Sequence, residues 1–195
     1  MQKLAKCDLY TLEAYASERS AFRARVLAHK QPRTVHLGAH LTLVFEDRLT
    51  IQYQIQEMLR IERIFEASGI QEELDAYNPL IPDGTNLKAT LLIEYADADE
   101  RAKRLVELHG IEHKIALHIG ALAPAFAHAD EDLDRSTDAK TSAVHFLRFE
   151  LSPAHVAALR GDGATAAAFV VEHPAYSARE VLLPATRQAL AADLD

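Results

Sequence analysis

Residues 33–48, RTVHLGAHLTLVFEDR, carry the alternation of apolar and polar side chains that decides the fold class. A two-residue turn at 38–39 would place the apolar sets of the two halves on opposite faces. A three-residue loop at 38–40 instead pairs Leu37 with Leu41, so that both sets lie on one face. That face contains Val35, Leu37, Leu41, Leu43 and Phe45. The stretch therefore predicts an antiparallel hairpin with a three-residue loop.

Similar alternation recurs along the chain. Residues 165–173 and 179–184 predict a second hairpin around the sequence PAYS. Pro124 favours an edge position for the strand predicted at 122–129, because proline cannot donate a hydrogen bond to a neighbouring strand. The other predicted strands are 87–96, 112–120 and 142–151.

Segments with helical spacing separate these strands. Asp8 is the expected N-cap of the first helix, and Ser152 caps a helix that begins at Pro153. The other predicted helices are 50–67, 70–77, 97–110 and 185–194, the first helix being 8–29. Few strand–helix–strand crossovers are present. We therefore expect a single α+β domain over residues 1–195, with a mainly antiparallel sheet covered by helices and a long central helix at about 50–67.

Composition limits the functional class. The net charge is −8 with neutral histidines, and the scattered lysines and arginines argue against nucleic-acid binding. No apolar run approaches the roughly 18–20 residues of a membrane span. The first ten residues lack the apolar core of a signal peptide, so we expect a cytoplasmic protein. Cys7 is the only cysteine, which excludes an internal disulfide and cysteine-rich metal motifs.

The predicted helix at 50–67 has an unusual polar strip between two apolar flanks. Gln52, Gln56, Arg60 and Arg63 lie within one arc of this helix at about 100° per residue. In one interpretation, Glu57 and Glu62 on its flanks pair with arginines of neighbouring elements and fix the helix in place. In the other, the strip lines a cavity for an anionic or planar ligand, because arginine binds such groups bidentately.

Two strands supply further candidate residues. His145 shares a strand face with Leu147, Phe149 and Leu151, so we expect it to point inward. Arg148 and Glu150 lie on the opposite face, and Lys88 shares one face of its own strand with Thr90 and Glu94. If these faces meet the polar strip, they form a charged pocket; if they face water, they are ordinary exterior surfaces. The candidate ligand-binding residues are Gln52, Gln56, Glu57, Arg60, Arg63, Lys88, His145, Arg148 and Glu150.

No metal site is predicted from the spacing of the ten histidines. There is no HExxH motif and no ExxH pair, although a mixed histidine and carboxylate site from distant elements stays open. Asp130, Asp132 and Asp134 resemble the start of a calcium loop. However, Arg135 and Thr141 replace the required glycine and glutamate, so we expect a solvated acidic turn. Catalytic residues and cofactors are not assigned.

Several long segments resemble the bacterial family named domain of unknown function 3501. They are HLGAHLTLVFEDR, YQIQEMLRIERIF, GIQEELDAYNPLIPDGTNLKATLLIEY, EDLDRS, KTSAVHFLRFEL and HPAY, which together cover most of the chain. The resemblance implies no activity and no catalytic residue. Members of that family look like gene-order neighbours of rubrerythrin-like and iron–sulfur oxidoreductase-like proteins. This implies a role near peroxide or anaerobic redox metabolism, with a partner of one of these types.

Three functional classes follow. The favoured class is a binding or accessory protein linked to redox or oxidative-stress metabolism, with a polar pocket between the 50–67 helix and the sheet. It would use the loop NPLIPDGTN at 78–86 together with the polar strip. The second is a metal-dependent or small-molecule enzyme whose site joins Glu57, Arg60, His145 and Glu150. The third is a structural subunit of an assembly of unknown size.

Overall fold

The computed structural model describes residues 1–195 apart from 132, 138, 162 and 164. Its strands form one eight-stranded sheet in the order β1-β2-β3-β6-β5-β4-β7-β8, and every neighbouring pair is antiparallel. The predicted α+β class with a mainly antiparallel sheet is therefore confirmed. The strands are β1 (Thr34–Leu37), β2 (Leu41–Glu46), β3 (Asn86–Ile93), β4 (Ile115–Ile119), β5 (Ala125–Ala129), β6 (Val144–Glu150), β7 (Ala167–His173) and β8 (Tyr176–Val181).

The β1–β2 hairpin has the predicted register. Leu37 pairs with Leu41 across a loop of three residues, and Gly38 supplies the positive φ of 72° that this loop needs. The five apolar residues assigned to one face are all at most 4% exposed. The second predicted hairpin is also present as β7–β8, where His173 pairs with Tyr176. Alternation therefore predicted the inward face of the first hairpin and the presence of the second.

The sheet curls until its two outer strands, β1 and β8, come close together. The Tyr176 hydroxyl in β8 donates a hydrogen bond of 2.6 Å to the carbonyl of Leu37 in β1. It also accepts one of 3.2 Å from the backbone N–H of His40. The resulting barrel-like sheet encloses the largest apolar core. Within it, Phe169 lies 5.0 Å from Phe45 and 5.1 Å from Phe149 between ring centroids.

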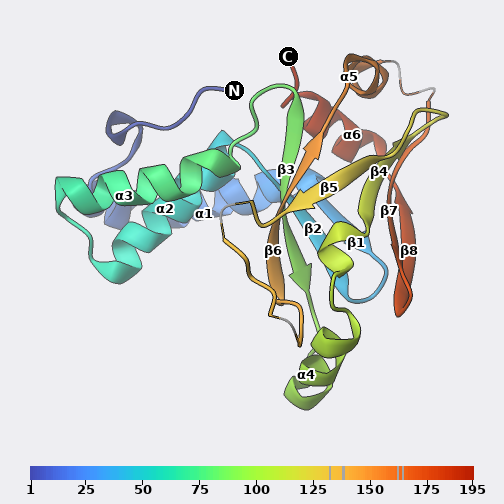
Figure 1. Ribbon diagram of the computed structural model, residues 1–195. Coiled ribbons are helices and arrows are strands. Elements are labelled where there is room, and N and C mark those ends of the chain that lie inside the picture. Colours follow the sequence, from blue (N-terminus) through green and yellow to red (C-terminus); the bar gives the residue numbers. More distant parts are fainter. Residues whose placement is uncertain (132, 138, 162, 164) are drawn as a thin grey trace.

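The helices lie outside this curled sheet. Figure 1 shows α1, α2 and α3 gathered on one side, α4 at one end, and α5 and α6 toward the other end. The α-helices are α1 (Leu12–Lys30), α2 (Arg48–Glu62), α3 (Ala67–Tyr77), α4 (Ala98–Glu107), α5 (Pro153–Arg160) and α6 (Pro184–Ala191). Short 3-10 turns are η1 (Lys6–Asp8), η2 (Gln31–Arg33), η3 (Asn78–Leu80) and η4 (Ile111–His113). Among the described residues, no helix is long and apolar enough to cross a membrane.

Three predicted helix boundaries are confirmed or corrected by their caps. Ser152 caps α5 as predicted, with Pro153 at its first position. The prediction for Asp8 is wrong, because Thr11 caps α1 and Asp8 belongs to the preceding 3-10 turn. α2 ends at Glu62, five residues before the predicted end, because Arg63 adopts a left-handed conformation with φ 56°. Its N–H then bonds to the carbonyl of Leu59 and closes the last turn.

The predicted edge position of the strand at 122–129 is also wrong. β5 lies inside the sheet, between β6 and β4. Pro124 immediately precedes its first residue, Ala125, and so occupies no position in the hydrogen-bonded ladder. The proline therefore does not prevent pairing on both sides of the strand.

A buried ion network joins the segment that follows α1 to the residues that follow α6. Arg33 is 4% exposed, and its guanidinium makes two bonds of 2.7 Å to the carboxylate of Asp193. It also lies 3.2 Å from Asp47, which accepts a 2.5 Å contact from His29. Asp47 is the N-cap of α2, bonded to the backbone N–H groups of Leu49 and Thr50. The network thus fixes the start of α2 against the end of α1, η2 and the residues after α6.

Candidate functional site

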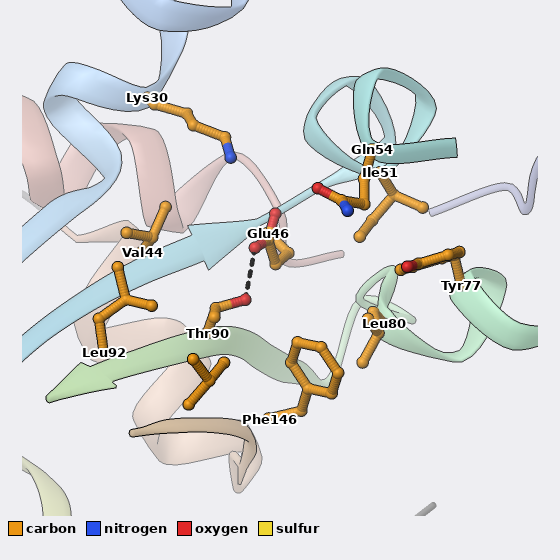
Figure 2. A pocket seen from close by; sticks show the side chains of 11 residues that line it. Lys30, Val44, Glu46, Ile51, Gln54, Tyr77, Leu80, Thr90, Leu92 and Phe146 are labelled. Carbon is orange, nitrogen blue, oxygen red and sulfur yellow. Dashed lines mark hydrogen bonds between the residues drawn. The ribbon is translucent and has the colours of Figure 1, made fainter. Parts of the chain in front are cut away.

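A pocket of about 290 Å³ lies between the outer face of the sheet and the helices α1, α2 and α3. The outward residues of β2, β3 and β6 form its floor, and α2 and η3 close it from the other side (Figure 2). The lining residues are Lys30, Val44, Glu46, Ile51, Gln54, Tyr77, Leu80, Thr90, Leu92, Val144 and Phe146. Its size lies at the small end of the range for ligand pockets.

The pocket has one polar end. Glu46 is only 8% exposed, and its Oε1 accepts a 2.7 Å hydrogen bond from the Thr90 hydroxyl. Figure 2 shows the ammonium of Lys30 and the amide of Gln54 directed toward this carboxylate from the helix side. A buried carboxylate beside a cation and an amide can bind a polar group of a ligand. The remaining walls are largely apolar.

Sequence alternation and a helix cap place Glu46 in this position. Val44 and Glu46 point outward because Leu43 and Phe45 occupy the core face of β2. Asp47 immediately follows and starts α2, so the helix turns back over the outward face. Ile51 and Gln54 on α2 then face the strand residues.

The predicted polar strip faces away from this pocket and holds the N-terminal segment. Gln52 Nε2 donates a 2.6 Å hydrogen bond to the carbonyl of Asp8. Gln56 is fully buried, and its Oε1 accepts a 2.6 Å bond from the N–H of Tyr10. Residues two apart on a helix are separated by about 200°, which explains why Gln54 lines the pocket and Gln52 does not.

Glu57 pairs with an arginine of a neighbouring helix, as one interpretation of α2 predicted. Its carboxylate accepts two bonds of 2.8 Å from Arg19 and one of 2.7 Å from the Tyr15 hydroxyl, both on α1. Arg60 adds a weaker bond of 3.2 Å. The hydrogen bonds from Arg19, followed by those from Tyr15 and Arg60, lower the pKa of Glu57 to about 2 despite its partial burial. Arg60 and Arg63 themselves are exposed at the end of α2.

Lys88, Arg148 and Glu150 form a separate group on the outer face of the sheet. Lys88 on β3 pairs with Arg148 on β6, and burial together with the Arg148 charge lowers the pKa of Lys88. Arg148 binds the carboxylate of Glu131 through bonds of 2.7 and 2.8 Å, and it also contacts Glu150. Among the described residues, no hydrogen bond or ion pair joins this group to the polar strip of α2.

His145 points inward, as predicted, and is fully buried. Its Nδ1 lies 2.5 Å from the carboxylate of Asp130. Its Nε2 lies 2.8 Å from the Thr141 hydroxyl and 3.0 Å from the Ser142 carbonyl. The Thr141 hydroxyl donates its proton to Glu112 at 2.9 Å, so it accepts from the imidazole. Both ring nitrogens therefore face oxygen atoms that can accept a hydrogen bond.

The carboxylates around His145 differ from those predicted from the sequence. Glu57 and Glu150 lie on other surfaces, whereas Glu112 is 3% exposed and accepts bonds from Ser136 and Thr141. Burial would raise the pKa of Glu112. The hydrogen bonds from its own backbone, Ser136 and Thr141, together with the charge of His145, outweigh that effect and lower it.

The predicted solvated acidic turn is wrong at its first residue. The side chain of Asp130 is 9% exposed and binds His145, Arg135 and the N–H of Phe146. Asp132, the second residue of that turn, lies outside the described residues. The sequence spacing of Thr141 and His145 does not predict the cluster around His145, because Glu112 and Asp130 come from distant segments of the chain. Among the described residues, no group of three metal-binding side chains is positioned to hold a metal.

The fold and the pocket define a class of curled antiparallel sheet proteins with a recess of about 290 Å³ between the outer face of the sheet and α1, α2 and α3. The chain belongs to the family described as Protein of unknown function (DUF3501), whose model matches residues 3–194.

A solved structure shares this fold over its full length. The crystal structure of a novel protein of unknown function from Burkholderia pseudomallei K96243 is similar to this chain with a TM-score of 0.93. The two sequences are 51% identical, and the match covers 100% of each chain. No curated protein matches the chain.

Proposed function

We propose that the protein is a binding or accessory protein whose pocket between α2 and the sheet takes a small, partly apolar ligand. The observation that supports this proposal most strongly is Glu46, a carboxylate only 8% exposed at the end of a largely apolar recess. A buried carboxylate with one hydrogen bond from Thr90 is costly unless another group completes its solvation. A ligand with a hydrogen-bond donor beside an apolar body would supply that group.

A pocket-filling variant tests this proposal. Val144 is 39% exposed and lines the pocket on β6, so Val144→Trp places a large side chain at that position. Val106 on α4 is 54% exposed and outside this lining, which makes Val106→Trp a matched control. Ligand-observed NMR with a mixture of small amphipathic fragments should show binding to the wild type and to Val106→Trp, and little to Val144→Trp. Equal fragment binding by both variants would place the site elsewhere.

A second observation supports the accessory role. The last turn of α2 and the segment that follows it expose Ile61 at 61% and Phe65 at 69% of their surface, beside the exposed cations Arg60 and Arg63. We call these four residues the α2–α3 corner. An adjoining apolar groove of about 280 Å³ includes Phe65. Exposed apolar side chains that cluster in this way are typical of surfaces that bind other proteins.

The redox link remains part of this proposal and is supported by the family resemblance. Its implied partners are a rubrerythrin-like or an iron–sulfur oxidoreductase-like protein. Size-exclusion chromatography and cross-linking with one purified protein of each type test it. Ile61→Glu with Phe65→Glu should abolish a complex that the Val106→Glu control keeps. A complex that persists with the corner variant, or that forms with neither partner, would contradict this role.

The geometry around His145 argues against a catalytic role for this residue. The imidazole is fully buried, and its neighbour Thr141 is only 1% exposed. A substrate could touch neither side chain without rearrangement of β6. In our proposal, the cluster of His145 and its carboxylate partners therefore stabilises the fold. The pocket and the α2–α3 corner carry the binding functions.

A further inference from the structure

The polar end of the pocket holds one carboxylate and one ammonium. Glu46 contributes the negative charge and Lys30 the positive charge. Gln54 adds an amide that can both donate and accept hydrogen bonds. No ion pair with a described residue uses Lys30, and Glu46 has its hydrogen bond from the uncharged Thr90. The residues that line this end therefore carry one charge of each sign, and both are available to a ligand.

The other walls determine what the ligand carries beside its polar groups. Six aliphatic and aromatic side chains face the remaining space: Val44, Ile51, Leu80, Leu92, Val144 and Phe146. Figure 2 shows Leu80 and Phe146 on the side of the pocket away from Lys30. A volume of about 290 Å³ limits the ligand to a small molecule. A branched or aromatic side chain of a few carbons matches both the surface and the space.

We propose that the pocket binds a small zwitterion with an apolar side chain, the chemical class of the free apolar α-amino acids. The ligand ammonium binds Glu46 and the Thr90 oxygen, and its carboxylate binds Lys30 and the Gln54 amide. The apolar side chain lies against Leu80 and the sheet. This inference rests on the proposed function, because it requires that the pocket be a ligand site.

Ligands with a single charge fit this charge pattern less well. An amine without a carboxylate would satisfy Glu46 but bring a second cation next to Lys30. An acid without an ammonium would satisfy Lys30 but repel Glu46. In a partly desolvated pocket, an unpaired or repelled charge costs more than it does in water. Only the zwitterion pairs both charges at once.

Isothermal titration calorimetry with four probes tests the ligand class. L-Phenylalanine and L-leucine carry both charges, whereas phenethylamine and 3-phenylpropanoate each lack one charged group of phenylalanine. At least one of the two amino acids should bind. Its affinity should be at least about tenfold higher than that of either singly charged probe. Equal or tighter binding of the amine or the acid would overturn the zwitterion and leave the pocket as a ligand site.

Paired variants assign the two charges. Glu46→Gln should weaken amino-acid binding about tenfold or more and tighten binding of 3-phenylpropanoate, because the repelling carboxylate is gone. Lys30→Met should weaken amino-acid binding to a similar extent and tighten binding of phenethylamine, because the repelling ammonium is gone. Glu94→Gln is a matched control, since Glu94 accepts a hydrogen bond from Thr42 on the neighbouring strand but lies outside this pocket. Lys103→Met, at an exposed position on α4, is the control for Lys30.

The outcomes separate this inference from the proposed function. Lys30→Met should fold, because the Lys30 side chain is not in the core. Its loss of amino-acid binding therefore tests the inference even if Glu46→Gln fails to fold. Binding unaffected by either folded variant would overturn the inference. If none of the four probes binds while Val144→Trp still blocks fragments, the zwitterion is wrong and the pocket stands. If Val144→Trp also has no effect on fragments, both proposals fail.

Discussion

Glu57 shows how a single side chain can connect two helices. The sequence offered two interpretations of α2, and the bonds from Arg19 and Tyr15 support the one in which a glutamate pairs with a neighbouring helix. Glu62, which had the same expectation, is exposed at the end of the helix. The difference arises because α1 packs against only one side of α2. Which side of a helix its neighbour covers cannot be predicted from the sequence of either helix alone.

The Glu57 ion pair should make stability depend on pH. The pKa of Glu57 falls from its ordinary value of 4.5 to about 2 in the folded chain. The pair therefore contributes fully above about pH 4.5 and loses its contribution as the pH falls toward 2. Glu57→Gln should lower the free energy of unfolding at pH 7 by about 1–2 kcal/mol after solvent screening, and by less at pH 3.

Urea unfolding at both pH values measures this difference. Glu62→Gln is the matched control on the same helix and should leave the free energy of unfolding within about 0.5 kcal/mol of the wild type. A Glu57→Gln deficit that is equal at pH 7 and pH 3 would show that packing, rather than the ion pair, carries the effect.

His145 marks the limit of prediction at this scale. Alternation along β6 gave its inward direction correctly, since Leu147 and Phe149 share its face. Its partners could not be predicted, because Asp130 and Glu112 come from segments 15 and more residues away whose positions depend on the whole sheet. Periodicity gives the direction of a side chain but not what it meets.

At the scale of elements, α2 combines two functions on its two sides. Ile51 and Gln54 face the pocket, and Gln52 and Gln56 on the other side bind the backbone of the N-terminal segment. The glutamines that the sequence suggested for a ligand therefore act as hydrogen-bonding groups for the chain itself. Extended backbone has N–H groups that need acceptors once buried, and Gln56 supplies one for Tyr10.

Removing the Gln56 amide should release the N-terminal segment. Gln56→Leu keeps most of the side-chain volume but leaves the Tyr10 N–H without its acceptor, at a cost of about 1–3 kcal/mol. Hydrogen exchange should then accelerate in residues 4–10 more than in the sheet. Gln54→Leu, two positions away on the opposite side of α2, should leave this exchange unchanged. Equal acceleration in both variants would point to a general loss of helix stability.

Element types were more predictable than element ends. Capping by Ser152 followed from a local hydrogen-bonding preference that depends on neighbouring residues alone. The end of α2, capped by Arg63, could not be predicted, because no feature of the sequence indicates a left-handed arginine with φ 56°. The edge position predicted from Pro124 was wrong for a related reason. A shift of one residue decides whether the proline lies inside the strand or just before it.

At the scale of the whole molecule, the sequence predicted an antiparallel sheet but not its closure. Local hairpins reveal which strands are neighbours along the chain. The approach of β1 to β8 joins segments more than a hundred residues apart, as the bond from Tyr176 to Leu37 shows. Arg33 and Asp193 make a second connection of this kind. The floor of the pocket also joins distant parts of the sequence, because β6 pairs with β3 beside β2.

Gly38 is the position at which sheet closure can be tested. Its φ of 72° already disfavours any other residue, and a Cβ there would run into the Tyr176 hydroxyl and come within 3.2 Å of the ring carbon Cζ. Gly38→Ala should therefore cost about 2–4 kcal/mol, from backbone strain together with displacement of the hydroxyl that joins β8 to β1.

Gly110 provides the control that separates these two contributions. Its φ of 83° gives similar strain, but a Cβ there meets no atom within 4 Å. Gly110→Ala should cost about 1 kcal/mol from strain alone. Denaturant unfolding should thus rank the wild type above Gly110→Ala and Gly110→Ala above Gly38→Ala. Tyr176→Phe, which removes only the hydroxyl, should cost about 1 kcal/mol and reduce the additional effect of Gly38→Ala in the double variant. Equal costs for the two alanine variants would mean that contact between β1 and β8 contributes little, and that the curvature of the sheet is set by its interior packing.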